Sequence, residues 1–309
     1  MSISVVINTK NAAETLSRVI KSVHDLANEV VVVDMKSTDD TVKIATELGA
    51  KVFAYPHDLG FADPARNWAL RKASSEWILV LDADEEVSSS LCSYLLEIVK
   101  NEVDAKLVGD CYFLPRQNII FGQALMHTGW WPDYQLRFFK KGTVQWTDRV
   151  HTHPVARGKV IYLPAQEKFA ILHHNYQSVN QFVDRLNRYT EFEAAIRPEI
   201  EQLTGSQVIE SFSNEFLRRF FAEEGWRDGT HGISLAFLQS FYEITASLKQ
   251  WQRGKFVPTT TAKLAAEKQT ILTLAKFRRD LGYWLADWQV KRSSGLVKIY
   301  WMIRRKLAI

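Results

Sequence analysis

The chain has 309 residues, of which 46% are hydrophobic and 24% charged, the ordinary balance of a globular protein. This composition excludes a disordered, collagen-like or coiled-coil chain, and at roughly 150 residues per domain the length predicts about two domains. The formal net charge of +4 is too small to indicate a nucleic-acid-binding protein. Eight of the ten tryptophans lie from Trp130 onward, so the later part of the chain concentrates large, half-polar rings.

The cysteine content and the N-terminus indicate the compartment. The two cysteines, Cys92 and Cys111, cannot form a disulfide framework, which fits a reducing compartment. The opening MSISVVINTK lacks a basic segment followed by a long apolar one, so we expect no signal peptide. No apolar run approaches the roughly 20 residues of a membrane span. We therefore expect a cytoplasmic protein, with peripheral attachment to the inner face of the cytoplasmic membrane left open.

The first hundred residues alternate between strand and helix patterns. Short β-branched runs predict buried strands, and apolar residues spaced three and four apart predict helices. The expected strands are 4–8, 29–34, 51–54 and 76–81, and the expected helices are 12–26, 41–48, one from 63 and 88–99. This order is typical of a parallel sheet covered by helices on both faces.

Ligands of such sheets bind at the carboxyl ends of the strands, where this chain carries acidic residues. Neither GxGxxG nor GxxxxGK[ST] follows the first strand, which argues against a dehydrogenase and against a P-loop nucleotidase. Asp82 and Asp84 follow the fourth strand. Two carboxylates at this spacing suit a hard divalent cation that shares its ligands with a substrate diphosphate. The alternative is a solvated loop in which Asp84 or Glu85 caps the next helix.

Several segments carry recognisable motifs. They are NTKN at 8–11, VDMKSTDDT at 33–41, GFADPARNWAL at 60–70, LVLDADEE at 79–86, WWPDYQLRFFKK at 130–141 and RDGTHGI at 227–233. Together they resemble the inverting glycosyltransferases of family 2, and more narrowly the bacterial branch that includes lipopolysaccharide-core β-glucosyltransferases. The resemblance implies an α/β fold of the GT-A nucleotide-diphospho-sugar transferase type, with a Rossmann-like mixed sheet and a C-terminal helical extension.

The resemblance also implies a nucleotide pocket at the ends of the first two strands. Asp34 would accept hydrogen bonds from the nucleotide base, and Asn8, Thr9 and Asn11 would line the same pocket. Relatives commonly have Ser-Gly after the aspartate of the second strand, where this chain has Met35-Lys36. That departure would alter the fit around base and ribose.

The diphosphate and its metal ion are implied beside this pocket. Asp82 and Asp84 would hold Mg²⁺ or Mn²⁺ against the donor diphosphate, with His151 or His153 as a further ligand. A zinc site is less attractive, because no cysteine or HExxH spacing accompanies the histidines. Arg66, near the N-terminus of the helix from residue 63, would bind the phosphates, since the helix dipole favours anions there. A surface arginine paired with an acidic residue is the alternative.

An inverting transferase needs a carboxylate that removes the proton of the acceptor hydroxyl. Asp133 matches the position of the base in the family best, and Asp148 is the second choice. Each has the alternative of being an ordinary turn residue. Relatives often have Arg-Val-His-Glu where this chain has RVHT at 149–152. Thr152 cannot replace that glutamate, which leaves the acceptor open and also allows a chain that has lost its activity.

We expect a catalytic domain over 1–175, with a nucleotide-sugar half at 1–100 and an acceptor half at 101–175, and a helical region over 176–309. The expected helices of this region are 179–196, 208–222, 233–251, one from 261 to 284 or beyond, and one from 295 to the end. Residues 288–309 contain six cations interleaved with aromatic residues and no acidic group. This pattern is typical of a helix at an anionic membrane surface, with docking on its own domain as the alternative.

The expected function is transfer of a hexose of glucose type, from a UDP-sugar, to a lipid-linked envelope glycan such as a lipopolysaccharide core. The expected partners are the nucleotide sugar, a glycan or glycolipid acceptor and an anionic membrane surface, without nucleic acid. Two alternatives remain. One is glycosylation of a peptide or protein side chain, and the other is a non-catalytic module that binds nucleotide or saccharide.

Overall fold

The computed structural model describes residues 2–57, 63–146, 154–198, 202–257 and 263–307. The chain divides into two compact units, residues 1–119 with 130–175, and residues 120–129 with 176–309. Each unit has its own hydrophobic core.

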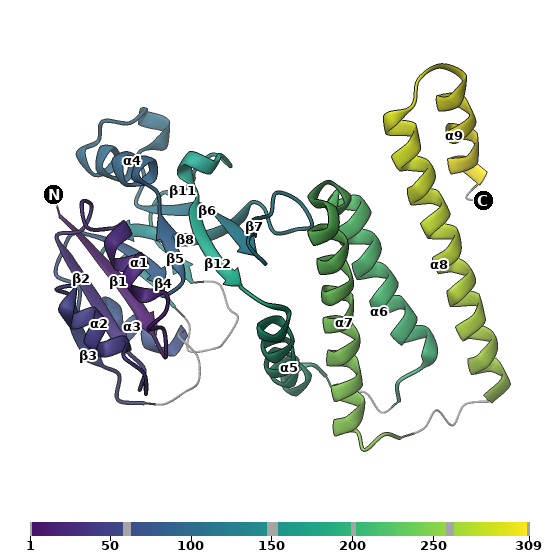
Figure 1. Ribbon diagram of the computed structural model, residues 1–309, viewed down its shortest axis with the longest axis horizontal. Helices are drawn as coiled ribbons and strands as arrows, with labels where there is room; N and C mark the ends of the chain where they lie inside the picture. The colour runs from purple at the N-terminus through teal and green to yellow at the C-terminus, as the bar shows by residue number, and fades with distance from the viewer. Residues whose placement is uncertain (1, 58–62, 147–153, 199–201, 258–262, 308–309) are drawn as a thin grey trace. The chain divides into compact units, whose positions relative to one another are not determined.

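The first unit is a mixed sheet with helices on both faces (Figure 1). Its longer strands are β1 (Ile3–Thr9), β2 (Glu29–Asp34), β3 (Lys51–Ala54), β4 (Trp77–Asp82), β5 (Glu85–Val87), β6 (Cys111–Ile120), β8 (Asp133–Lys140), β11 (Val160–Tyr162) and β12 (Ile171–Tyr176). Its helices are α1 (Leu16–Ser22), α2 (Thr41–Glu47), α3 (Asp63–Leu70) and α4 (Ser89–Lys100). The strands lie in the order β3-β2-β1-β4-β8-β6-β12-β5, and β11 pairs with β6. A separate two-stranded sheet joins β9 (Val144–Gln145) and β10 (Val155–Ala156).

Successive residues of the central strands point to opposite faces of the sheet, and each face has its own apolar cluster. Val5 and Leu79 belong to the cluster that packs against α1, α2 and α4. Val6 and Ile78 belong to the cluster that packs against α3. Because the central strands are buried on both faces, they read as nearly continuous apolar runs in the sequence.

The strand register aligns the polar residues at one edge of the sheet. β1, β2, β3 and β4 are parallel neighbours. Asn8 lies opposite Asp82 on β4, and Thr9 lies opposite Asp34 on β2. The expected parallel arrangement of the first four strands is therefore confirmed, and their carboxyl ends meet where a ligand would bind.

Two local expectations differ from the structure. The helix expected over 12–26 is limited to Leu16–Ser22. On its N-terminal side, Thr41 at the start of α2 and Asp39 just before it accept hydrogen bonds from the backbone N–H groups of Ala12 and Ala13, which holds that stretch as a turn. α4 is capped by Ser88, whose Oγ accepts a hydrogen bond from the N–H of Leu91 at 3.2 Å. Asp84 and Glu85 are therefore not the caps of this helix.

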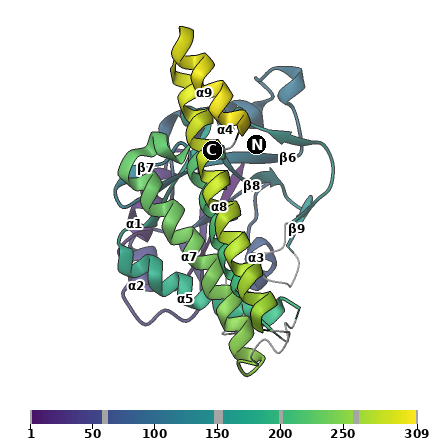
Figure 2. The ribbon, with the colours of Figure 1, turned by 90° about the vertical axis from the view of Figure 1, so that its right-hand side faces the viewer.

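The second unit is helical. Its helices are α5 (Val179–Ile196), α6 (Gly205–Leu217), α7 (Gly229–Arg253), α8 (Lys263–Arg292) and α9 (Gly295–Leu307), with the short strand β7 (Gln123–Ala124). A short π-helix at Arg218–Ala222 and a 3₁₀-turn at Gly225–Asp228 connect α6 to α7. α8 and α9 lie side by side (Figures 1 and 2). Within the described ranges, no helix combines the length and apolar character that a membrane crossing requires.

Asp228 attaches residues 126–128 to the helices of this unit. Its buried carboxylate accepts hydrogen bonds from the backbone N–H of His127 at 3.0 Å and from the Thr128 hydroxyl at 2.9 Å. The Nδ1 atom of His127 lies 3.0 Å from the same carboxylate. Gly232, four residues along the RDGTHGI segment from Asp228, lies directly against the backbone of Gly225.

The close approach at Gly232 leads to a stability prediction. A Cβ atom there would overlap the carbonyl of Gly225, which is backbone and cannot rotate away. We expect Gly232→Ala to lower the free energy of unfolding by roughly 1–3 kcal/mol, the usual cost of overpacking. Urea denaturation followed by circular dichroism measures this change. Ser234→Ala at a half-buried position of the same helix is the control, and an equal effect of the two substitutions would contradict the steric explanation.

Candidate active site

Two buried polar side chains at the end of β1 have no hydrogen-bond partner among the described residues. Asn8 is 5% exposed and Thr9 is 2% exposed. Both amide atoms of Asn8 and the hydroxyl of Thr9 are unpaired. A buried polar group without a partner costs on the order of 1–3 kcal/mol. Its presence at the carboxyl edge of the sheet therefore points to a ligand that completes these hydrogen bonds.

The loops after β1 and β2 hold each other. The Asp34 carboxylate accepts a hydrogen bond from the N–H of Ser37 at 3.1 Å. Asn11 accepts one from the N–H of Thr38 at 2.8 Å, so its side chain supports the loop after β2. Lys36 has a φ of 64°, the left-handed region that glycine adopts most easily. A glycine at this position would adopt the same conformation without strain.

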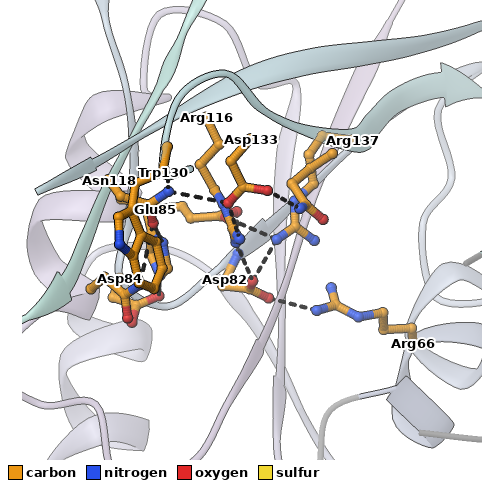
Figure 3. A network of polar contacts seen from close by, with 12 residues as sticks. Arg66, Asp82, Asp84, Glu85, Arg116, Asn118, Trp130, Asp133 and Arg137 are labelled. Atoms are coloured by element: carbon orange, nitrogen blue, oxygen red, sulfur yellow. Dashed lines mark hydrogen bonds and ion pairs between the residues drawn. The ribbon is translucent and has the colours of Figure 1, made fainter. Parts of the chain in front are cut away.

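A cluster of buried charges lies beside this edge (Figure 3). The Asp82 carboxylate accepts hydrogen bonds from Arg66 at 2.7 Å and from Arg137 at 2.5 Å. Glu85, which is 0% exposed, accepts from Arg137 at 2.7 Å and from Arg116 at 3.0 Å. Burial on its own would raise the pKa of Asp82, but the guanidiniums of Arg137, Arg66 and Arg116 lower it well below the ordinary value. Arg66 is buried and paired with Asp82, so it is not a surface arginine.

Asp133 extends the cluster at the start of β8. It lies opposite Arg116 on β6 in the strand register, and Arg116 donates to it at 2.5 Å. Asn118 and Gln135 donate to the same carboxylate at 3.1 and 2.8 Å. Burial would raise the pKa of Asp133, but Arg116 and these hydrogen bonds lower it overall. The carboxylate is therefore ionised at neutral pH.

Asp84 faces a histidine from the far end of the sheet. The Nε2 atom of His173, on β12, lies 3.6 Å from Oδ1 of Asp84. Asn118 donates through its amide nitrogen to Trp130 and Asp133, so its oxygen is the atom that lies 2.7 Å from Nδ1 of His173. Nδ1 then donates its hydrogen to this oxygen, and in the neutral form of the ring the lone pair is on Nε2, the atom that faces Asp84.

The donor set at Asp84 and His173 fits a divalent cation. One carboxylate oxygen and one imidazole lone pair face each other, and an amide fixes the ring as in known metal-binding histidines. Asp82 differs, since its carboxylate is bound by guanidiniums. In the part of the chain that the structure describes, no group of three or more His, Cys, Asp and Glu residues gathers as a metal cluster. Waters and a diphosphate would supply the remaining ligands.

Asp148, His151, His153 and Thr152 lie outside the described residues. The structure also brings in residues that the motifs did not assign, namely Glu85, Arg116, Asn118 and His173. Charged and amide residues within the otherwise apolar β6 strand were the signal for Arg116 and Asn118, but their partners depend on a strand register that the sequence does not reveal.

The buried charges lead to a stability prediction: removing one cation should destabilise the protein strongly, and removing a carboxylate as well should restore part of the lost stability. Arg137→Met removes a partner of both Asp82 and Glu85, and leaving buried carboxylates short of a cation costs roughly 3–5 kcal/mol. Adding Glu85→Gln removes one of these carboxylates, so the double variant should recover part of the loss. Thermal or urea unfolding of both variants gives the coupling energy. A double variant no more stable than Arg137→Met would contradict the pairing.

Residues 4–161 match the model of glycosyl transferase family 2. An uncharacterized glycosyltransferase of Rickettsia felis is 48% identical over 89 residues, which are 29% of this chain and 31% of that protein. This chain therefore matches only about a third of the length of that relative. The lipopolysaccharide core biosynthesis glycosyltransferase LpsC of Rhizobium meliloti is 25% identical over 79% of this chain and 89% of its own length.

Among solved structures, residues 1–349 of S. aureus TarS in complex with UDP-GlcNAc are 14% identical, with a TM-score of 0.44, over 100% of this chain and 89% of that one. The family match and the strand order confirm the expected α/β fold of GT-A type with C-terminal helices. The matched residues span about half of the chain and carry the whole parallel edge described above. The chain belongs to glycosyl transferase family 2.

Proposed function

We propose that the protein is a metal-dependent inverting glycosyltransferase that uses a UDP-hexose. The observation that carries the proposal is that two pairs of polar side chains meet around the end of β4. Asn8 and Thr9 have side-chain atoms without hydrogen-bond partners among the described residues, and Asp84 and His173 have ligand atoms that face each other. The first pair suits a nucleoside and the second suits a metal-bound diphosphate. Membership of the family supports the reaction type.

The nucleotide would occupy the ends of β1 and β2. Asp34 lies beside Thr9 in the strand register and would accept hydrogen bonds from a uracil ring. Asn8 presents both a donor and an acceptor that lack partners. Arg66 reaches Asp82 from the helix α3, and its guanidinium is a good partner for the diphosphate oxygens.

Mg²⁺ or Mn²⁺ would be held by Asp84 and His173, and when bound it would offset the charge that develops on the leaving diphosphate. Asp82, although part of the same Asp-Ala-Asp segment, would keep Arg66 and Arg137 in place. Asp133 would accept the proton of the attacking hydroxyl, which its ionised carboxylate can do. Its bonds to Arg116 and Asn118 fix the carboxylate in one position.

The donor and metal sites are tested together by a panel of UDP, GDP and ADP sugars with Mn²⁺. We expect UDP-hexoses to raise the melting temperature and to be hydrolysed slowly to free UDP. Asp84→Asn should abolish both effects, because it removes the carboxylate proposed to bind the ion. Asp25→Asn, at a side chain that is 97% exposed, is the matched control. Full hydrolysis by Asp84→Asn, or no shift with any nucleotide sugar, would refute the proposal.

The base is tested by Asp133→Asn. General-base catalysis contributes roughly 10²–10⁴-fold, so we expect nucleotide release to fall by about this factor. The melting-temperature shift with UDP-hexose and Mn²⁺ should persist, because Asp133 is not assigned to donor binding. The measurement is release of UDP with water as the acceptor, for which no saccharide acceptor is needed. Hydrolysis at the rate of the unmodified protein would exclude Asp133 as the base.

We propose a lipid-linked envelope glycan as the acceptor, which brings the protein to an anionic membrane surface. LpsC, whose name assigns it to lipopolysaccharide core biosynthesis, aligns with most of this chain. Helix α9 has no buried residue and exposes the apolar side chains of Leu296, Ile303 and Leu307. Such a helix with cations suits the interface of an anionic bilayer. Transfer to a peptide and not to a glycolipid would contradict this choice of acceptor.

A further inference from the structure

A pocket of about 570 Å³ lies within the helical unit, in a part of the chain that the donor site does not use. Trp226 and Arg227 line it from the 3₁₀-turn before α7, and Leu285, Trp288 and Arg292 line it from α8. Leu285, Trp288 and Arg292 are spaced three and four residues apart, so they form one stripe along α8. The walls are mostly aromatic and aliphatic, and the charged groups at the pocket are cationic.

Arg292 is held between two indole rings. Its guanidinium carbon lies 4.3 Å from the ring centre of Trp226 and 4.6 Å from that of Trp288. The two rings are nearly perpendicular, at 87°, with centres 6.1 Å apart. A guanidinium has five N–H donors, so its contacts with the two rings leave donors available for an anion.

The charge of Arg292 has no acidic partner among the residues that the structure describes. Three nearby cations do have an acidic partner. Lys291 and Arg305 are 3.1 and 2.6 Å from the carboxylate of Asp287, and Arg227 is 2.9 Å from Glu224. A guanidinium that contacts two indole rings and has no acidic partner among the described residues, on the wall of an aromatic pocket, suits an anion attached to an apolar body.

We propose that this pocket binds the phosphate headgroup of an anionic membrane phospholipid, with Arg292 on the phosphate and Trp226 and Trp288 at the level of the headgroups. Tryptophan is enriched at that level of a bilayer, and arginine binds phosphate through paired N–H donors. The inference rests on the membrane surface named in the proposed function, but not on the transfer chemistry.

The chain after Arg292 favours a lipid over a free phosphate. Helix α9 follows within three residues and carries Leu296, Tyr300, Ile303 and Leu307 along one stripe, which are 84%, 53%, 54% and 58% exposed. Exposed apolar side chains at this spacing bury in the upper part of a bilayer leaflet. A soluble phosphate would satisfy Arg292 but would leave that stripe in water.

The test is vesicle co-sedimentation with phosphatidylcholine alone and with phosphatidylcholine mixed with phosphatidylglycerol. The variants are Arg292→Gln and Arg278→Gln, the second at an exposed arginine of the same helix outside the pocket. Loss of one surface cation lowers partitioning by about fivefold. We expect Arg278→Gln to stay within that limit, and Arg292→Gln to lose tenfold or more on the mixed vesicles only. Equal losses for the two variants would mean general charge attraction and would overturn the site.

Two further measurements separate the remaining outcomes. Brominated phosphatidylglycerol should quench tryptophan fluorescence, and the Trp226→Phe/Trp288→Phe variant should lose most of that quenching even if its affinity is reduced. Fluorescence changes with inorganic phosphate but none with vesicles would assign the pocket to free phosphate and contradict the lipid. UDP-hexose hydrolysis without vesicles should be unchanged in Arg292→Gln. A failure of the lipid site therefore leaves the proposed transferase activity separately testable.

Discussion

A fully buried carboxylate, Glu85, lies next to the Asp-Ala-Asp segment, and the need to neutralise it determines much of the surrounding structure. Its partners, Arg116 and Arg137, come from β6 and β8. A slip of one residue in either strand would turn its arginine to the opposite face of the sheet, away from the carboxylate. The ion pairs therefore favour one register, and that register also brings Asp133 opposite Arg116.

The same pairing gives different chemistry to two aspartates that are two residues apart. Asp82 accepts hydrogen bonds from two guanidiniums, so it can hold cationic side chains near a diphosphate but is poorly suited to a metal ion. Asp84 instead faces the Nε2 atom of His173, and a neutral imidazole nitrogen is a common ligand of divalent metals. In the proposed function, one member of a motif that looks symmetrical in sequence would therefore position arginines and the other would bind the cation.

Local patterns predicted the fold well and the site only in part. The strands 29–34 and 51–54 and the helix 179–196 have the expected bounds, since each depends on periodicity within a few residues. The contacts of Arg116 and Asn118 were not predictable, because β6 and β8 carry a register shift at Tyr112 and Phe113. His173 is separated from Asn118 by 55 positions. Hydrophobic periodicity is a local pattern, so it does not predict which residues so far apart in the sequence come into contact.

In the helical unit, whether a cation is available to a ligand depends on its ion-pair partners more than on the number of cations in the segment. The six cations of residues 288–309 look equivalent in the sequence, yet Asp287 binds two of them, Lys291 and Arg305. That acidic residue lies just outside the cation-rich segment, so a count over the segment misses it. Arg292 has aromatic partners and no acid among the described residues. A membrane surface would therefore meet a few positioned cations next to an apolar helix, and the binding specificity would come from Arg292 more than from the total charge.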